Sequence, residues 1–199
     1  FLQTGNVRNY ALMVLAGAVG AAAWLLLYGE TVVNQGMLLS ALTLIPGLAG
    51  LALLLFPPRG AASLHRWTGL LASVASFALA LLAWSRFDAA NPAFQMVEVQ
   101  PWLPQYGIFY RLGVDGISMV LVLLTTFLQP LVLIASWRSI KEKVKGYVAA
   151  MLLLETGMIG AFLATDLFLF YVFWELMLVP MYFIIGVWGG ERRVYAAVK

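Results

Sequence analysis

The sequence contains no cysteine, a single histidine (His65) and little charge: Asp, Glu, Lys and Arg together make up 11% of its 199 residues. The lack of cysteine excludes disulfide scaffolds, thiolate catalysis and zinc or iron–sulfur sites held by cysteine. One histidine cannot form a metal cluster by itself. Soluble domains carry about 25% charged residues, so the low charge also argues against a soluble enzyme.

Apolar residues take the place of the missing charge: 63% of the chain is hydrophobic, with a mean hydropathy of +0.91. A soluble core of this size cannot bury so many apolar side chains, and a disordered chain would not contain them. The residues occur in long unbroken runs rather than in the short alternating segments of an outer-membrane barrel. The sequence therefore predicts an all-α fold, a polytopic transmembrane helix bundle.

Long apolar runs predict about six membrane spans, because a bilayer core about 30 Å thick requires roughly 20 helical residues. The predicted spans cover residues 8–28, 37–56, 67–85, 114–137, 147–164 and 167–188. Prolines mark the predicted loops, since proline cannot continue a helix interior: Pro57, Pro58, Pro92, Pro101 and Pro104. Asp166 immediately precedes the last run as an N-cap signal, which predicts a tight hairpin between the last two spans.

The basic residues predict the orientation of these spans. If residue 8 is cytoplasmic and the chain crosses six times, ten of the 12 Lys and Arg residues lie on the cytoplasmic side. They are Arg8, Arg59, Arg66, Arg138, Lys141, Lys143, Lys145, Arg192, Arg193 and Lys199, against Arg86 and Arg111 on the opposite side. This split satisfies the positive-inside rule. We expect a multi-pass membrane protein, with its N-terminus and basic loops in the cytoplasm.

The chain divides into two unequal pieces. Residues 1–36 hold the first span and a polar linker at 29–36, and residues 37–199 begin with Met37 and hold the other spans. The first residues lack the charged region and small-residue cleavage site of a signal peptide. Residues 196–199 are typical of a helix that is just beginning. We therefore expect the sequence to be part of a longer protein.

Glu175 is the strongest candidate for chemistry. Seven apolar or weakly polar residues lie on each side of it within its predicted span. A charged group near the bilayer centre costs at least roughly 2.5–3.5 kcal/mol, so this carboxyl must face protein or internal water. Desolvation favours its protonated form, and a carboxyl that can take up and release a proton suits a proton relay. The alternative is a structural carboxyl that bonds neighbouring helices together.

Two further residues accompany Glu175. Pro180 lies on the same predicted helix and frees the carbonyl of Leu176, which creates a gap for water beside the carboxyl. Glu155 is a second acid within an apolar run, and it is either a second relay or a structural carboxyl paired to a neighbour. Sequence spacing does not show whether the two acids face each other.

The other polar residues have structural interpretations. Asp115 and Asp166 are interpreted as helix caps, and His65 as an interfacial residue in a loop. Trp67, Trp102, Trp137 and Trp188 lie near predicted span boundaries, as membrane-interface anchors do. Gly157 and Gly160 form a small-residue face for close helix packing.

Three motifs carry a resemblance to a known family. Residues 112–118 (LGVDGIS), 168–183 (FLFYVFWELMLVPMYF) and 185–193 (IGVWGGERR) resemble the proton-pumping, antiporter-like subunit M of bacterial respiratory complex I, the NADH:quinone oxidoreductase. The resemblance covers residues 37–199 and implies that Glu175 matches the key transmembrane glutamate of that family. Residues 1–36 resemble the C-terminal transmembrane end of the neighbouring subunit L, which implies a junction of the two subunits.

The resemblance implies a membrane-arm subunit that couples electron transfer elsewhere in the complex to proton transport. It implies that NADH, flavin, iron–sulfur clusters and quinone are bound by other subunits, that this chain holds no cofactor, and that its partners are the other membrane subunits, above all the neighbouring antiporter-like chains. The family's full subunit has further helices with lysines that pair with the glutamate, and these are absent here. The alternatives are a subunit of a multisubunit sodium/proton antiporter or membrane-bound hydrogenase, and an inert scaffold.

Overall fold

A computed structural model describes residues 36–55 and 62–198 of the chain. The predicted first span at 8–28, most of the linker, the piece that resembles subunit L, and the loop residues Pro57, Pro58 and Arg59 lie outside the described residues. The other five predicted spans lie within them.

Five of the described helices are long and apolar enough to cross a membrane. They are α3 (Leu38–Leu55), α4 (Ala62–Arg86), α5 (Gly116–Ala135), α6 (Val144–Leu163) and α7 (Leu167–Trp188), and a short helix, α8 (Arg193–Val198), follows them. The five spans are confirmed, with boundaries that differ from the predicted ones by a few residues. The polytopic helix bundle is confirmed as well.

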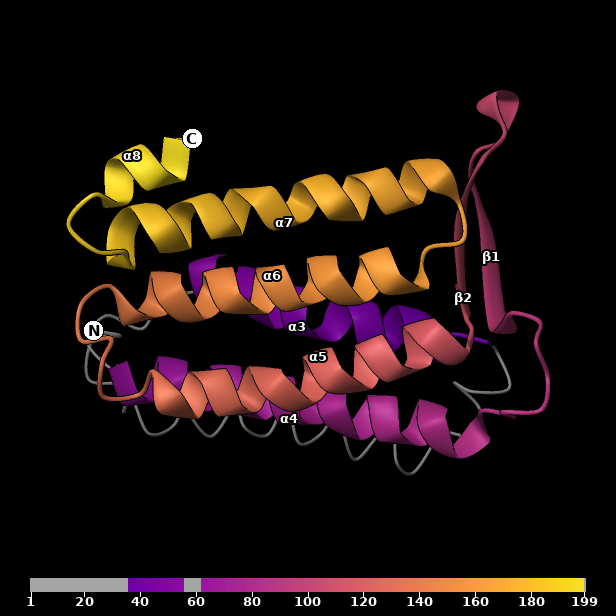
Figure 1. The fold of residues 1–199 in the computed structure, drawn as a ribbon, viewed down its shortest axis with the longest axis horizontal. Coiled ribbons are helices and arrows are strands. Elements are labelled where there is room, and N and C mark those ends of the chain that lie inside the picture. The colour runs from indigo at the N-terminus through magenta and orange to yellow at the C-terminus, as the bar shows by residue number, and fades with distance from the viewer. Residues whose placement is uncertain (1–35, 56–61, 199) are drawn as a thin grey trace, which may run out of the picture.

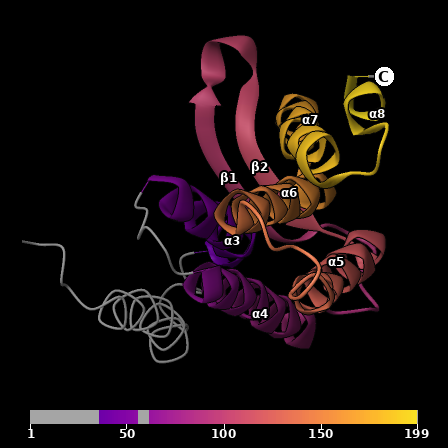
Figure 2. The same ribbon diagram turned by 90° about the vertical axis from the view of Figure 1, so that its left-hand side faces the viewer.

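α6 is the central helix of the bundle, and α3, α4, α5 and α7 surround it (Figure 2). Close packing at the centre depends on glycine: a Cβ atom at Gly69 of α4 would lie 2.3 Å from Val148 of α6. On the other side of α6, a Cβ atom at Gly160 would lie 2.3 Å from the ring of Phe173 in α7. The predicted packing role of Gly157 and Gly160 is confirmed, because α7 packs directly on both.

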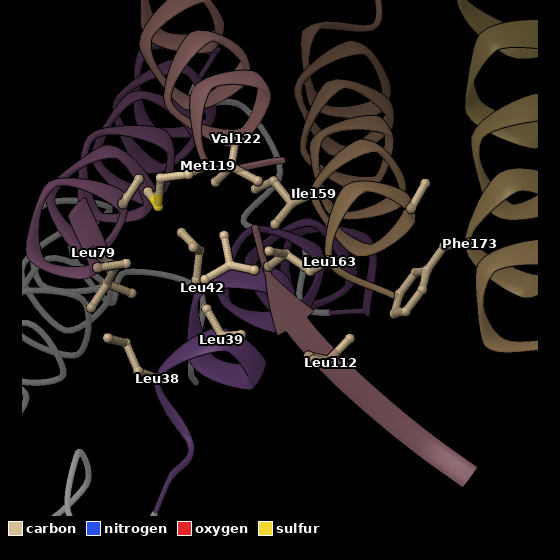
Figure 3. Packing of buried hydrophobic residues seen from close by; sticks show 14 of the residues in the cluster. Leu38, Leu39, Leu42, Leu79, Leu112, Met119, Val122, Ile159, Leu163 and Phe173 are labelled. Carbon is tan, nitrogen blue, oxygen red and sulfur yellow. The ribbon is translucent and has the colours of Figure 1, made fainter. Parts of the chain in front are cut away.

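The largest core lies near one end of the bundle, where α3, α4, α5, α6 and α7 meet (Figure 3). Leu39, Leu42, Leu112, Val122 and Ile159 are among its side chains, each 0% or 1% exposed. Burial of such side chains stabilises a fold by about 1.5–3 kcal/mol each in water, and within a bilayer the same close packing acts mainly through van der Waals contact.

A β-hairpin lies between α4 and α5, where the sequence predicted only loops (Figure 1). Its antiparallel strands are β1 (Gln95–Leu103) and β2 (Ile108–Val114), and the 3-10 turn η1 (Pro104–Tyr106) joins them. The loop interpretation of Pro101 was wrong, since it lies inside β1 and pairs with Phe109. Both strands of a two-stranded sheet are edges, and an edge can accommodate a residue without an N–H group.

The hairpin is anchored to the helices by long-range hydrogen bonds. Glu98 of β1 accepts hydrogen bonds from the backbone N–H groups of Leu39 (2.6 Å) and Ser40 (3.0 Å) at the start of α3, and from the Ser40 hydroxyl. The backbone N–H of Thr165, between α6 and α7, donates to the carbonyl of Arg111 in β2 at 3.0 Å. The hairpin therefore connects the start of α3 to the α6–α7 turn.

The two ends of the bundle differ in charge. One end, which we call the basic end, contains the start of α4, the α5–α6 loop and the α7–α8 turn; the opposite end, the hairpin end, contains β1 and β2 (Figure 1). Among the described residues the basic end holds Arg66, Arg138, Lys141, Lys143, Lys145, Arg192 and Arg193, and the hairpin end holds Arg86 and Arg111. The predicted grouping of these charges is thus present in the fold.

Candidate functional site

Glu175 lies in the middle of α7, a 22-residue helix whose other residues are apolar or weakly polar. Its side chain is exposed on the surface formed by the described residues. The same outer surface of α7 carries Tyr171, Trp174, Val179 and Phe183, which are 49–60% exposed. The described helices therefore leave the carboxyl uncovered.

The inner surface of α7 explains this orientation. Phe173, Met177 and Pro180 follow one another at helical spacing, and Phe173 and Met177 pack on the glycines of α6. Glu175 lies two residues from Phe173 and from Met177, which corresponds to about 200° of helix rotation in each case. The side chain must then point away from α6.

Glu155 lies in α6 and is fully buried, at 0% exposure. Among the described residues neither of its carboxylate oxygens has a hydrogen-bond partner. Gly157, two residues later, packs on α7, so Glu155 lies on the opposite face of α6, about 200° away. The structure thus answers the question that spacing left open: the two acids point away from each other, on opposite sides of the α6–α7 pair.

Pro180 is buried within a continuous α7, on the same helix face as Phe173. It is five residues from Glu175, which places the two side chains about 140° apart around the helix. The proline therefore does not share a surface with the carboxyl. The gap that we expected beside Glu175 could involve only the freed backbone carbonyl of Leu176.

Asp115 and Asp166 act as helix caps, which confirms their interpretation. Asp115 caps α5, accepts a hydrogen bond from the backbone N–H of Ser118 at 2.7 Å and forms a capping box with that residue. The Ser118 backbone hydrogen bond is the main reason that the pKa of Asp115 lies below its usual range. Asp166 caps α7 and accepts from the N–H groups of Phe168 (2.9 Å) and Leu169 (3.0 Å).

His65 was wrongly predicted to lie in a loop. It belongs to the first turns of α4, is 6% exposed, and its Nε2 atom has no hydrogen-bond partner among the described residues. The helix begins at Ala62, five residues before the predicted start at Trp67. The prediction followed the apolar run alone, whereas the helix also includes the more polar residues that precede this run. Trp67 and Trp137 pack edge to face, with ring centroids 5.3 Å apart, at the basic end.

Sequence reasoning missed a polar cluster at the hairpin end, formed by Glu98, Ser40 and Tyr110. The Tyr110 hydroxyl donates to Ser40 Oγ at 3.1 Å, and Ser40 bonds Glu98. Burial raises the pKa of Glu98, although its hydrogen bonds to Ser40 and Leu39 act in the opposite direction. Burial also raises the pKa of Tyr110. Ser40 is 58 positions from Glu98 and 70 positions from Tyr110, so no local pattern could have joined it to them.

The described residues contain no group of three or more His, Asp or Glu side chains that could hold a metal ion. Within the described parts of α3 to α7, lysine and arginine occur only in the first turns of α4 and α6 and in the last turn of α4. Neither Glu155 nor Glu175 therefore has a cationic partner at its own depth in these helices.

Two family models match adjoining parts of the chain. Residues 67–165 match the amino terminus of NADH-ubiquinone oxidoreductase chain 4, and residues 164–199 match the transmembrane region of the NADH:quinone oxidoreductase/Mrp antiporter family. Glu155 lies in the first match and Glu175 in the second.

Curated relatives agree with these matches. NADH-quinone oxidoreductase subunit M of Rhodobacter capsulatus is 47% identical over 166 residues, which cover 81% of this chain and 32% of the relative. NADH-ubiquinone oxidoreductase chain 4 of Arabidopsis thaliana is 45% identical over 162 residues, again 81% of this chain and 32% of the relative. The chain thus spans about a third of the length of the curated relatives that it matches.

Solved structures show the same arrangement of helices. A chain of respiratory complex I from Thermus thermophilus superposes with a TM-score of 0.66 at 29% identity, over 80% of this chain and 31% of the other. The Mrp complex from Dietzia sp. DQ12-45-1b superposes with a TM-score of 0.62 at 24% identity, over 81% of this chain and 17% of the other, and shows the fold alone. Together with the five spans, these matches show a multi-pass membrane protein that belongs to the family of NADH-quinone oxidoreductase subunit M, also called chain 4.

Proposed function

We propose that the chain is part of the membrane arm of a proton-translocating NADH:quinone oxidoreductase, in which Glu175 carries the transported proton. The observation that carries this proposal is a single carboxyl in the middle of an apolar helix of 22 residues, in a chain that belongs to the subunit M family. Intramembrane acids are rare because of their cost, and they mark ion pathways by default.

The exposure of Glu175 supports a contact with further protein. Contact with lipid would cost at least roughly 2.5–3.5 kcal/mol near the bilayer centre, whereas a polar or hydrated contact removes that cost. Further helices of the same assembly, from this subunit and the adjacent antiporter-like chains, cover the outer surface of α7 in our proposal. They also supply the cationic partner that the described helices lack.

The redox groups belong to other subunits in this proposal. Electron transfer there changes the hydration or the charge near Glu175, and this change alters the proton affinity of the carboxyl and the side from which it is reached. The described helices contribute a carboxyl that is held at a fixed depth, because the glycines of α6 position the inner surface of α7.

We assign the basic end of the bundle to the cytoplasm of a bacterial inner membrane. The support is the distribution of charge: seven Lys or Arg residues of the described chain lie at the basic end and two at the hairpin end. Positively charged loops are retained in the cytoplasm, so the hairpin would lie on the opposite side.

Glu175→Gln in the intact complex tests this function. We expect NADH-dependent quinone reduction to become uncoupled or inhibited and the ratio of protons to electrons to fall, because an amide cannot carry the proton. The matched control is Glu191→Gln, which makes the same change in an exposed residue after α7 and should leave the ratio unaltered. An unchanged ratio in the Glu175 variant would refute the proposal.

A second candidate is a subunit of a multisubunit sodium/proton antiporter. The match of residues 164–199 to a family that includes the Mrp antiporter favours it, as does the similar fold of the Mrp complex. Dependence of proton movement on NADH oxidation in native membranes would support the oxidoreductase. Sodium/proton exchange in the absence of NADH would support the antiporter.

A further inference from the structure

The carboxyl of Glu155 has no hydrogen-bond partner among the described residues, and helix phase places it on the face of α6 that packs against α4 and α5. Contacts near the basic end define this interface: a Cβ atom at Gly69 of α4 would lie 2.3 Å from Val148 of α6 and 3.6 Å from Leu133 of α5. α4 and α6 run in the same direction and α5 runs against them (Figure 1). Glu155 is seven residues after Val148, two helical turns along the same face and about 10 Å closer to the hairpin end.

Ser76 and Thr126 lie at the level of Glu155. Ser76 is seven residues after Gly69, and Thr126 is seven residues before Leu133. Each residue therefore lies on the same helix face as its counterpart in the Gly69–Leu133 contact, two turns closer to the hairpin end. The Phe77 and Phe127 rings, 5.6 Å apart, confirm this register of α4 against α5. Ser76, Thr126 and Glu155 are each 0% exposed, so three polar side chains share one buried level.

Polar groups continue from this level toward the basic end. One turn closer to it, the side-chain amide of Gln129 donates to the carbonyl of Met151 at 2.9 Å, and this bond fixes α5 against α6. Ser73 of α4 lies at the same level as Gln129 and is 0% exposed. The hydroxyls of Ser73, Ser76 and Thr126 donate to carbonyls of their own helices. Their oxygen lone pairs remain available to accept a hydrogen bond from water.

A small cavity lies nearer to the basic end. Its volume is about 10 Å³, and Arg66, Leu133, Ser136, Tyr147 and Val148 are among the residues that line it. A cavity of about this volume holds one water molecule. Because Leu133 and Val148 also make the contact that defines the interface, the cavity lies within the same interface, on the basic-end side of Glu155.

The charged and titratable groups of this interface are at its ends. Among the described residues, α3 and α5 hold no charged or titratable group. α4 holds His65 and Arg66 at the basic end and Arg86 at the hairpin end. α6 holds Lys145 and Tyr147 besides Glu155. The guanidinium of Arg66 donates to the Ile140 carbonyl, and Lys145 Nζ donates to the Leu54 carbonyl. These cations are engaged at the surface, two turns or more from Glu155, and do not neutralise it.

We propose that Glu155 is a second proton-binding site, reached by water from the basic end through the α4–α5–α6 interface and separate from Glu175. A hydronium ion that arrives along Ser73 and Gln129 transfers its proton to a carboxylate oxygen of Glu155; an O–H bond forms and water is released. Unlike a paired structural carboxyl, this group has no hydrogen-bond partner for either oxygen in the described part of the chain, and it has hydroxyls at its own level. The inference rests on the proposed function and adds a site to it.

Infrared difference spectroscopy of the intact complex, recorded while the pH is changed in the absence of NADH, tests the proposal. A carbonyl band of a protonated carboxyl should be present in the parent complex, disappear in Glu155→Gln and persist in Glu175→Gln. Thr126→Val should slow the hydrogen–deuterium exchange of this band about tenfold, the effect of losing one hydrogen bond on the route. Thr125→Val is the matched control: it makes the same change at the neighbouring position, which is less buried, and should leave the rate unaltered.

A band that survives in Glu155→Gln, or an exchange rate that Thr126→Val and Thr125→Val affect equally, would overturn the second site. If Glu155→Gln prevents assembly, Glu155→Asp retains a carboxyl, and a shifted band supports the site whereas an unshifted band contradicts it. These readouts need no turnover. Failure of the second site would therefore leave the role of Glu175 intact, and that role fails separately if Glu175→Gln leaves the proton-to-electron ratio unchanged.

Discussion

Glu155 and Glu175 show that residue type alone does not determine whether a side chain is buried or which way it points. Both are glutamates within apolar helices, yet Glu155 is fully buried with no partner among the described residues, and Glu175 is exposed on the described surface. The difference arises from helix phase relative to the glycines of α6, because Gly157 and Gly160 determine which face of each helix the other covers. An acid two residues from a packed position must point the other way.

Glu98 provides a pH-dependent prediction at the residue scale. Burial raises its pKa above the ordinary 4.5, so the folded state binds this proton more tightly than the unfolded state. The stabilisation from this group is complete below 4.5 and is lost as the pH rises through the raised pKa. We expect Glu98→Gln to remove this part of the pH dependence, as measured by thermal unfolding of the protein in detergent over a range of pH.

The comparison must be the difference between parent and variant, since the lowered pKa of Asp115 acts in the opposite direction and loses its stabilisation as the pH falls. Glu98→Gln should also destabilise the fold by about 1–3 kcal/mol, because an amide cannot replace both acceptor oxygens at the start of α3. A variant with the pH profile of the parent would contradict the role of the buried carboxyl.

Asp166 allows a simpler test of local structure. Asp166→Ala removes the acceptor of two backbone hydrogen bonds at the start of α7, and loss of such a cap costs about 1 kcal/mol. Unfolding in a denaturing detergent should show this loss. Asp88→Ala, which removes a hydrogen bond within an exposed turn, should have a smaller effect; equal effects would argue against the cap.

At the scale of elements, α7 depends on one side of α6 for its position. Gly160→Ala would place a Cβ atom 2.3 Å from Cδ1 and 2.4 Å from Cγ of Phe173. The ring cannot yield at Cγ without a shift of its whole side chain, so we expect a destabilisation of about 1–3 kcal/mol from overpacking.

Gly190→Ala is the control for this prediction, because nothing lies within 4 Å of a Cβ atom at that position. Thermal unfolding of both variants in detergent measures the difference. A Gly160 variant as stable as the Gly190 variant would show that α7 does not pack as described.

The hairpin is an element that helix periodicity does not reveal. Its strands are held by their mutual pairing and by bonds to α3 and to the α6–α7 turn. The bonds to the helices join residues that are distant in sequence. Its two prolines at 101 and 104 favoured a loop. Pro101 instead occupies a strand, since β1 has no second neighbouring strand among the described residues that would need the missing N–H group.

At the scale of the whole molecule, the absence of native cysteine permits a direct test of orientation. Lys141→Cys lies in the exposed α5–α6 loop at the basic end, and Tyr106→Cys lies at the tip of the hairpin, where Tyr106 is 75% exposed. A membrane-impermeant thiol reagent applied to intact cells should label the hairpin cysteine alone. In inverted membrane vesicles it should label the loop cysteine alone, and the reverse pattern would refute the assignment.

The sequence by itself determined the class of the protein, the positions of five helices, the caps at Asp115 and Asp166, and the presence of a carboxyl in the middle of an apolar span at position 175. Each depends on local information. This information consists of apolar runs long enough to span a membrane, side chains that form hydrogen bonds to the adjacent backbone, and an ionisable residue within an apolar span, where a charge is costly. Only the tertiary structure decided that His65 is helical and buried, that Glu98 joins the hairpin to α3, and that Glu155 and Glu175 point apart. These features depend on the rotation and register of helices against one another, which side-chain packing between distant segments determines and local sequence does not encode.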